Sequence, residues 1–150
     1  MTIDGTPKVG RVSGQVLRQH RSNHGGITVQ VTNGTTTLTS TTDAFGNFSI
    51  LAPLGTVSVS ANLSGYLGIR RVGVSVSSGA TATLPPRTLL VGEVTGDTCI
   101  DKADMTAILN AIGTSASPSD PRDVDGNRQI WYDDLGLASF KGGTCGPIGW

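Results

Sequence analysis

The sequence predicts a β-sandwich followed by a small α-helical module that carries two acidic loops. Residues 1–91 show short alternating runs of apolar and polar residues, which indicate strands. Residues 92–150 contain two similar acidic segments whose first residues, Glu93 and Asp123, are about 30 positions apart. The first region has seven Lys and Arg against two acids, a net charge of +5, and the second has four against nine, a net charge of −5. This charge asymmetry favours a domain boundary at residues 91 and 92.

The composition of the 150 residues is typical of an extracellular β-rich module. Charged residues make up 15% and aromatic residues 5%, and 21 residues are Gly. The sequence has no apolar run of about 20 residues, and Met1 is not followed by a signal peptide. We therefore expect a piece of a longer exported bacterial or archaeal protein, with a natural cytosolic protein as the alternative. The basic region has no dense Lys/Arg run, which argues against nucleic acid as a partner.

Eight segments of residues 1–91 are predicted strands, because β-branched residues alternate with polar ones between turn signals. Asn33-Gly34 favours a two-residue hairpin turn, since both residues tolerate positive φ. Seven or eight short strands in about ninety residues suggest a sandwich. The predicted strands are 9–17, 27–31, 35–41, 47–51, 56–63, 72–76, 80–84 and 87–91.

The first region offers little evidence for catalysis. His20 and His24 lie in a loop, and two histidines without a third ligand are a weak metal site. No Ser-His-Asp or Cys-His arrangement can be assembled, so we expect no enzyme. A carbohydrate-binding or enzymatic sandwich would need clustered aromatic groups, and this region has only Phe45, Phe48 and Tyr66.

The segment DVDGNRQIWYDD, residues 123–134, has the ligand spacing of a twelve-residue calcium loop. Calcium is a hard ion that takes about 6–8 oxygen ligands. The side chains at positions one, three, five and twelve would bind the ion, together with a backbone carbonyl at position seven. The predicted ligands are Asp123, Asp125, Asn127, Gln129 (carbonyl) and Asp134.

The segment EVTGDTCIDKAD, residues 93–104, has the same frame with weaker ligands. Glu93 is longer than the usual Asp at position one, and Thr95 offers only a hydroxyl at position three. We expect this loop to bind calcium more weakly than the loop at 123–134. The predicted ligands are Glu93, Thr95, Asp97, Cys99 (carbonyl), Asp101 and Asp104.

Both loops carry a residue other than Gly at position six, namely Thr98 and Arg128. A left-handed conformation there costs on the order of 1 kcal/mol, which lowers affinity without excluding binding. Position eight is apolar in both, Ile100 and Ile130, as a short β contact between paired loops requires.

A short helix is predicted after each loop. Met105, Ile108, Leu109 and Ile112 form an amphipathic stripe that Gly113 ends. In the second repeat, Leu135, Ala138 and Phe140 follow the loop, and Gly142-Gly143 ends the helix. No helix is expected before either loop, whereas an EF-hand has one on both sides.

The first region resembles the carboxypeptidase-regulatory-like or Cna-B-type (prealbumin-like) sandwich. The resemblance rests on GRVSGQV, GITVQVTN and STTDAFGNFSILAPLGTVSVSANLSGY and covers nearly all of residues 9–91. It implies a β-sandwich with a mostly structural role, as a spacer, stalk or support.

Residues 92–150 resemble a dockerin with two EF-hand-like calcium repeats of the F-hand type. The resemblance rests on GEVTGDTCIDKADMTAILNAIG, RDVDGNRQIWYDDLGLASF and the ending CGPIGW. It implies calcium-dependent docking of a secreted protein onto a cohesin of a scaffold or cell surface, as in the cellulosome and other polysaccharide-degrading assemblies. The whole chain is then similar to an X-module–dockerin pair, rigidly packed and monomeric when unbound. The implied partner-binding residues are Lys102, Ala103, Leu109 and Asn110 in the first repeat and Tyr132, Asp133, Ser139 and Phe140 in the second.

Three questions remain open at this point: the role of Leu109 and Phe140, the state of the cysteines, and the function of the module. Leu109 and Phe140 also suit a core position, and the two sets differ in chemistry, so equal binding by both is not expected. Cys99 and Cys145 are the only cysteines, and an even count in an exported protein favours a disulfide, with two free thiols as the alternative. The dockerin resemblance brings the module's two ends together near the first loop, which implies a Cys99–Cys145 bridge with Trp150 stacked across the same seam. The alternative to cohesin docking is a calcium-braced structural stalk without a cohesin partner.

Overall fold

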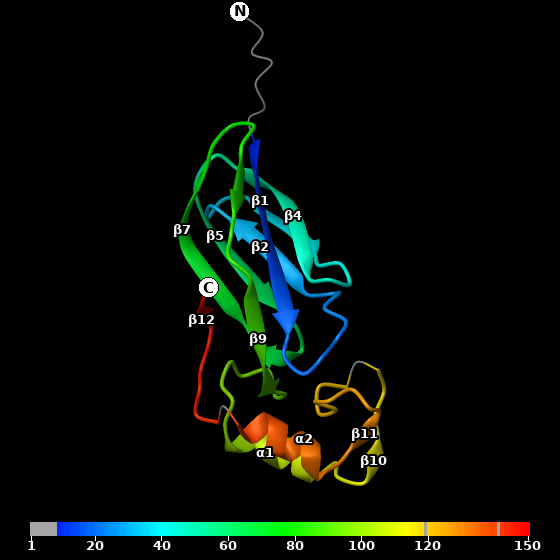
Figure 1. Ribbon diagram of the computed structural model, residues 1–150. Coiled ribbons are helices and arrows are strands. Elements are labelled where there is room, and N and C mark those ends of the chain that lie inside the picture. The colour runs from blue at the N-terminus through cyan, green and yellow to red at the C-terminus, as the bar shows by residue number, and fades with distance from the viewer. Residues whose placement is uncertain (1–8, 119, 141) are drawn as a thin grey trace, which may run out of the picture.

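The structure, a computed structural model, describes residues 9–118, 120–140 and 142–150 (Figure 1). Two β-sheets form a sandwich, and two short helices lie beyond one end of it. The predicted sandwich is therefore confirmed. Its strands are β1 (Val9–Arg18), β2 (Thr28–Thr32), β3 (Thr37–Thr41), β4 (Asn47–Pro53), β5 (Gly55–Asn62), β6 (Gly65–Leu67), β7 (Ile69–Val76), β8 (Thr81–Thr83) and β9 (Arg87–Glu93).

The sheets combine antiparallel and parallel pairs. The first has the order β4-β1-β9-β6, with β8 also paired to β1, and the second has the order β12-β7-β5-β2-β3. β1 runs antiparallel to β4 but parallel to β8 and β9. The last strand, β12 (Ile148–Gly149), comes from the extreme C-terminal part of the chain and lies parallel to β7.

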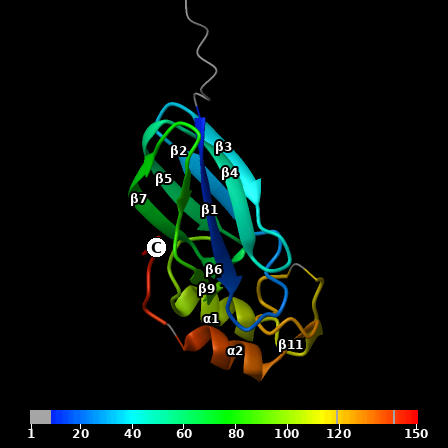
Figure 2. The ribbon, with the colours of Figure 1, turned by 45° about the horizontal axis from the view of Figure 1, so that its top comes forward.

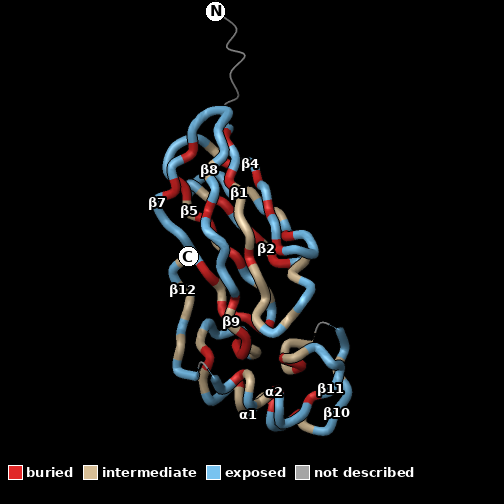
Figure 3. Tube along the Cα trace, viewed as in Figure 1, coloured by how far each residue is buried: buried red, intermediate tan, exposed pale blue. Residues whose placement is uncertain are grey.

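The core of the sandwich follows the alternation seen in the sequence. In β2, Val29 and Val31 are fully buried while Gln30 between them is exposed. Val12 and Val16 of β1 and Val57 and Val59 of β5 are buried in the same way, so each strand turns one face inward (Figure 3). Burial of one face is what fixes the register of these strands.

Three local expectations were wrong. The connection between β2 and β3 spans residues 33–36, which is longer than a two-residue turn, because Asn33 donates its N–H to the carbonyl of Thr36 (3.2 Å) and its side chain accepts from two following amides. The short strand β6 is not among the predicted strands, because its three residues are too few to show an alternating pattern. Strand β9 continues to Glu93, two residues beyond the end of the predicted strand 87–91.

The C-terminal region packs directly on the end of the sandwich. Helices α1 (Lys102–Leu109) and α2 (Tyr132–Ser139) contact each other, and both contact β9 (Figure 2). A Cβ on Gly92 would lie 2.7 Å from the carbonyl oxygen of Ala138, so only Gly lets α2 approach β9 this closely. The short strands β10 (Thr114–Ser115) and β11 (Gln129–Ile130) pair beside the helices.

The C-terminal tail returns to the sandwich. After β12, the ring of Trp150 meets Phe48 edge to face at 5.6 Å, and its indole N–H donates to the carbonyl of Pro85 (2.8 Å). Trp150 therefore packs on the sandwich. The expectation that it stacks across the seam beside the first loop was wrong. In the described residues, neither helix has the length and apolar character needed to cross a membrane.

Candidate metal centre

Two acidic loops, the first loop (residues 93–104) and the second loop (residues 123–134), share one hydrogen-bond frame. The carboxylate at position twelve is the centre of each frame. In the second loop, Asp134 Oδ1 accepts from the backbone N–H of Val124 (2.8 Å) and Asp125 (3.1 Å), and Oδ2 accepts from that of Trp131 (2.8 Å). Asp134 is completely buried, so these bonds replace its hydration.

The first loop repeats this arrangement position by position. Asp104, also completely buried, accepts from the backbone N–H of Val94 (2.8 Å), Thr95 (3.0 Å) and Asp101 (2.8 Å). The hydroxyl of Thr95 adds a fourth bond to Asp104 (3.0 Å). The predicted common frame of the two loops is therefore visible in their backbone.

The position-one carboxylates close the start of each loop. Glu93 Oε1 accepts from the N–H of Gly96 (2.6 Å) and Asp97 (3.2 Å). Asp123 accepts from the N–H of Gly126 (3.0 Å) and Arg128 (2.9 Å), one bond to each oxygen. The shorter Asp therefore uses both oxygens in the loop, whereas the longer Glu uses one.

Backbone strain lies where the sequence indicated it. Position six has a positive φ in both loops, 69° at Thr98 and 68° at Arg128, and position four is a Gly with positive φ. The cost of a left-handed non-Gly residue is on the order of 1 kcal/mol. The bonds to the position-one and position-twelve carboxylates hold the strained turn.

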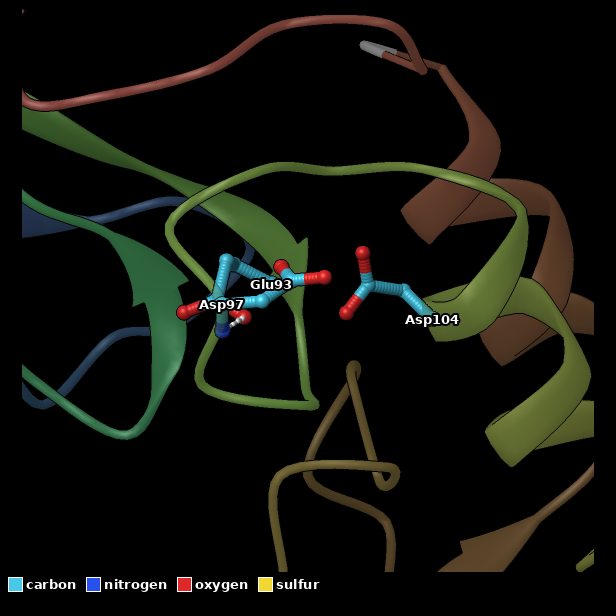
Figure 4. A group of neighbouring side chains, drawn as sticks. All are labelled: Glu93, Asp97 and Asp104. Carbon is cyan, nitrogen blue, oxygen red and sulfur yellow. Dashed lines mark hydrogen bonds between the residues drawn. The ribbon is translucent and has the colours of Figure 1, made fainter.

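Each loop gathers three carboxylates. Oxygens of Glu93, Asp97 and Asp104 lie within 4.8 Å of one another, and Figure 4 shows the Glu93 and Asp104 groups pointing toward each other. The predicted ligand Asp101 is not in this cluster, because its carboxylate caps α1 by accepting from the N–H of Ala103 (3.0 Å). The matching cluster in the second loop comprises Asp123, Asp125 and Asp134.

The electrostatics of the second cluster suit a cation. Burial raises the pKa of the Asp125 carboxyl above its ordinary value, and the nearby carboxylates of Asp134, Asp123 and Asp133 add to this shift. The N–H of Asn127 opposes the shift by donating to Asp125. The atoms that the cluster offers to an ion are all carboxylate oxygens, which suit a hard cation such as calcium.

The position-five residues of the two loops, Asp97 and Asn127, each accept a hydrogen bond from the N–H of position seven. Asn127 accepts through Oδ1 from the N–H of Gln129 (2.8 Å), and Asp97 accepts from that of Cys99 (3.1 Å). The carbonyls of Gln129 and Cys99 stay predicted ligands.

The position-eight residues do not pair with each other as expected. Ile130 accepts through its carbonyl from the N–H of Gly113 (2.8 Å), just after α1. Ile100 bonds Gly143 and Thr144 just after α2, at 2.6 and 2.8 Å. Each loop is thus joined by backbone hydrogen bonds to the segment that follows the helix of the other repeat.

The two cysteines form a disulfide, with Cys99 bonded to Cys145 across 46 positions of sequence. The bridge joins position seven of the first loop to the segment after α2. It extends the contact that Ile100 makes with Gly143 and Thr144.

All eight predicted partner-binding residues are exposed: Lys102, Ala103, Leu109, Asn110, Tyr132, Asp133, Ser139 and Phe140. Leu109 is 52% and Phe140 76% exposed, so neither belongs to the core, whereas Ile108 beside Leu109 is fully buried. Sequence reasoning missed Trp131, which is 53% exposed and meets Tyr132 edge to face at 5.9 Å. Its position nine in the second loop, next to Tyr132, was the available signal.

The other candidate groups of the sandwich have structural positions. His24 Nδ1 accepts from the backbone N–H of Arg18 (2.8 Å), which ties the loop after β1 to itself. Of the three aromatic residues considered for a carbohydrate platform, Phe48 and Tyr66 are buried and Phe45 is exposed.

Comparisons with known proteins place the chain by its fold. No family model matches it, and no curated protein matches its sequence. Among solved structures, it is similar to chains from two interface mutants of a type II cohesin–X-dockerin complex of Acetivibrio cellulolyticus. For the mutant at the C-terminal interface, the TM-score is 0.77 at 23% identity, over 91% of this chain and 97% of that chain. For the mutant at the N-terminal interface, the values are 0.75, 22%, 91% and 97%.

This likeness shows a shared fold. A match over 91% of the chain is too long for the sandwich alone, so it extends into the region of the two loops and helices.

Proposed function

We propose that the chain is a non-catalytic, calcium-dependent docking module that binds a cohesin domain and tethers a secreted protein to a scaffold or cell surface. The observation that carries this proposal is the pair of carboxylate-centred loops, each followed by a helix with exposed residues at both ends. The fold shared with chains of cohesin–X-dockerin complexes supports the same role.

Calcium would serve here as a structural ion. In the second loop, the carboxylates of Asp123, Asp125 and Asp134 supply clustered oxygen ligands, and we propose the amide oxygen of Asn127 as a further ligand. The ion would offset the burial, and after it the nearby carboxylates, that raise the pKa of Asp125. In the first loop, Thr95 stands where Asp125 stands in the second, so we propose two sites of unequal affinity.

The helix termini offer two docking sets with different chemistry. The second set combines the aromatic residues Tyr132 and Phe140 with the adjacent Trp131, all more than half exposed. Aromatic side chains at the centre of an interface contribute a large share of the binding energy. The first set, with Lys102, Ala103, Leu109 and Asn110, is smaller and more polar. We propose that the second set is the principal docking face.

Calorimetric titration against a panel of type I and type II cohesins tests the proposal. Binding is expected in calcium and is expected to disappear in EDTA, because the loops then lose the ions that hold the helix starts. Binding that persists after complete removal of calcium would overturn calcium-dependent docking. Calcium binding without binding to any cohesin of the panel would favour the structural alternative.

Paired substitutions test the choice of face. Tyr132→Ala and Phe140→Ala are each expected to weaken cohesin binding by about thirtyfold, the level of an interface hot spot of about 2 kcal/mol. The matched variants Lys102→Ala and Asn110→Ala should change the affinity by less than about threefold. The reverse pattern would assign the principal face to the first repeat.

A structural role as a stalk module is the second candidate. The C-terminal tail connects the C-terminal region to the sandwich, because β12 pairs with β7 and Trp150 contacts Phe48. A rigid unit of this kind suits a spacer, and the cohesin titration separates the two functions.

A further inference from the structure

Arg21 of the sandwich donates two side-chain hydrogen bonds to the second loop. It lies in the connection between β1 and β2, more than a hundred positions before the loop. Its Nη2 donates to the carbonyl of Asp123 (2.6 Å) and its Nε to the carbonyl of Val124 (3.3 Å). Two donors of one planar guanidinium thus hold two successive carbonyls.

These carbonyls belong to the two peptide units that hold Asp134. The unit between Asp123 and Val124 presents its carbonyl to Arg21 and its N–H to Asp134 Oδ1 (2.8 Å). The next unit presents the carbonyl of Val124 to Arg21 and the N–H of Asp125 to the same oxygen (3.1 Å). In each peptide unit, therefore, the carbonyl accepts from the guanidinium of Arg21 and the N–H donates to the carboxylate of Asp134.

The fit around the guanidinium is tight. A Cβ on Gly126 would lie 2.6 Å from both Cζ and Nη1 of Arg21, so the guanidinium packs directly on the backbone of the loop. Gly126 also has a φ of 81°, which a side chain would strain. The Gly at position four thus serves both the turn and the close approach of Arg21.

The first loop obtains the corresponding support from the sheet. Its position-one residue, Glu93, is the last residue of β9 and pairs with Gly65 of β6. Within the described residues, no side chain of residues 9–91 donates a hydrogen bond to residues 94–104. The second loop is remote in sequence from any strand of the sandwich, so Arg21 provides for it what strand pairing provides for the first.

We propose that Arg21 is a positioning residue for the second loop: it orients the two peptide units that hold Asp134, and thereby makes the cation affinity of that loop depend on the sandwich. The inference rests on the proposed calcium binding. Preorganised hydrogen bonds lower the free energy needed to order a binding loop, and chains of bonds through peptides reinforce one another.

The charge of Arg21 has the opposite effect. A cation bound near Asp123 is repelled by the guanidinium, and this repulsion is weakened by salt. Positioning and repulsion therefore predict opposite signs. Removing Arg21 weakens cation binding if positioning dominates and strengthens it if repulsion dominates.

The test uses the whole chain and Tb³⁺, which takes oxygen ligands as Ca²⁺ does. Trp131 is position nine of the second loop, so Tb³⁺ luminescence excited through Trp131 reports this loop, and Trp131→Leu identifies that signal. Arg21→Met and Arg21→Lys are expected to weaken Tb³⁺ and competing Ca²⁺ binding at this loop by about tenfold, at both low and high salt. Lys keeps the charge but lacks the planar fork in which two nitrogens, Nε and Nη2, each donate to one carbonyl. Arg11→Met, which removes a guanidinium that donates to Ser49 of β4, is the matched control and should leave the affinity unchanged.

Hydrogen exchange without metal is the second measurement. The amides of Val124 and Asp125 are expected to exchange about tenfold faster in Arg21→Lys, while those of Val94 and Thr95 keep their rates. Unchanged affinity and exchange in Arg21→Lys, or tighter binding in Arg21→Met, would overturn the inference. A wild-type chain that binds neither ion would overturn the proposed function and the affinity part of the inference, and the exchange rates would still decide whether Arg21 positions the loop.

Discussion

The first and second loops have nearly the same backbone hydrogen bonds but different side chains and different neighbours. In both, a buried Asp at position twelve, Asp104 or Asp134, accepts from the N–H groups of positions two, three and nine. At position three, the first loop has Thr95 where the second has Asp125. The shape of the loop therefore depends on the frame around position twelve, whereas we propose that the side chains at positions one, three and five set the difference in cation affinity between the loops.

The loops also differ in how they are attached to the rest of the molecule. The first loop begins inside β9 and is bridged by Cys99 to Cys145. The second loop is held by Arg21 from the sandwich and is preceded by the ion pair of Asp120 with Arg122 (2.8 Å). One loop is thus fixed mainly by covalent and strand connections, and the other by side-chain contacts.

The largest expected effect concerns the disulfide. Cys99→Ser combined with Cys145→Ser opens a connection across 46 positions, for which the chain-entropy model gives a loss of about 4 kcal/mol in the free energy of unfolding. Urea unfolding measures it, and reduction of the wild-type chain should reproduce it. Because the bridge touches only the first loop, the cation affinity of the second should not change. An equal loss of affinity in both loops would show that the attachments are not separate.

The position-twelve carboxylates come next. Asp134→Ala and Asp104→Ala should each lower the free energy of unfolding without metal by about 3 kcal/mol, because three backbone N–H groups lose a completely buried acceptor. The matched variants Asp134→Asn and Asp104→Asn keep one oxygen acceptor and should cost roughly half as much. Chemical unfolding in EDTA provides the measurement. A cost confined to one loop would contradict the idea of a common frame.

Exchanging the position-three residues tests whether side chains set the affinities. Thr95→Asp adds a carboxylate to the cluster of Glu93, Asp97 and Asp104, so the first loop should bind calcium about tenfold more tightly, equivalent to about 1.4 kcal/mol. Asp125→Thr should weaken the second loop by a similar factor. Calcium titration calorimetry resolves both changes. If neither affinity moves, the difference between the loops does not arise from position three.

The smallest expected effect is that of Asp120→Asn. The hydrogen bond from Arg122 holds the pKa of the Asp120 carboxyl below its ordinary value of 3.8. A lowered folded-state pKa means that this stabilisation is present above about pH 4 and is lost as the pH falls through the folded-state value. Since Arg122 is 42% exposed, the loss should stay under about 1 kcal/mol at neutral pH. Unfolding curves at pH 7 and pH 3 should therefore differ less in Asp120→Asn than in the wild type, and an equal difference would contradict this.

The sequence predicted the strands and the carboxylate clusters that depend on local patterns. The alternation in β1, β2, β4 and β5 predicted their inward faces, because period two places every second side chain in the core. The spacing of acidic residues located both carboxylate clusters, because neighbours on a tight turn must lie close together. Sequence reasoning missed the strand β6 and the end of the turn at Asn33, because these segments are too short to show a periodic pattern.

Long-range packing accounts for what the sequence could not show. Nothing in the sequence around Arg21 indicates that it reaches Asp123, and nothing in CGPIGW indicates that β12 would join β7. The exposure of Leu109 beside the buried Ile108 likewise depends on how α1 lies against α2 and β9.

The sequence by itself determined the sandwich, the two loop frames and the pair of helices, since each follows from residues that are close along the chain. Only the tertiary structure decided which side chains remain exposed for docking, that each loop bonds the segment after the other helix, and that Arg21 supports the second loop. These features depend on where distant segments meet. Distant segments pack together because apolar side chains such as Ile100, Ile108 and Ile130 are buried. The hydrophobic effect is not directional, so it does not specify which polar groups then become neighbours.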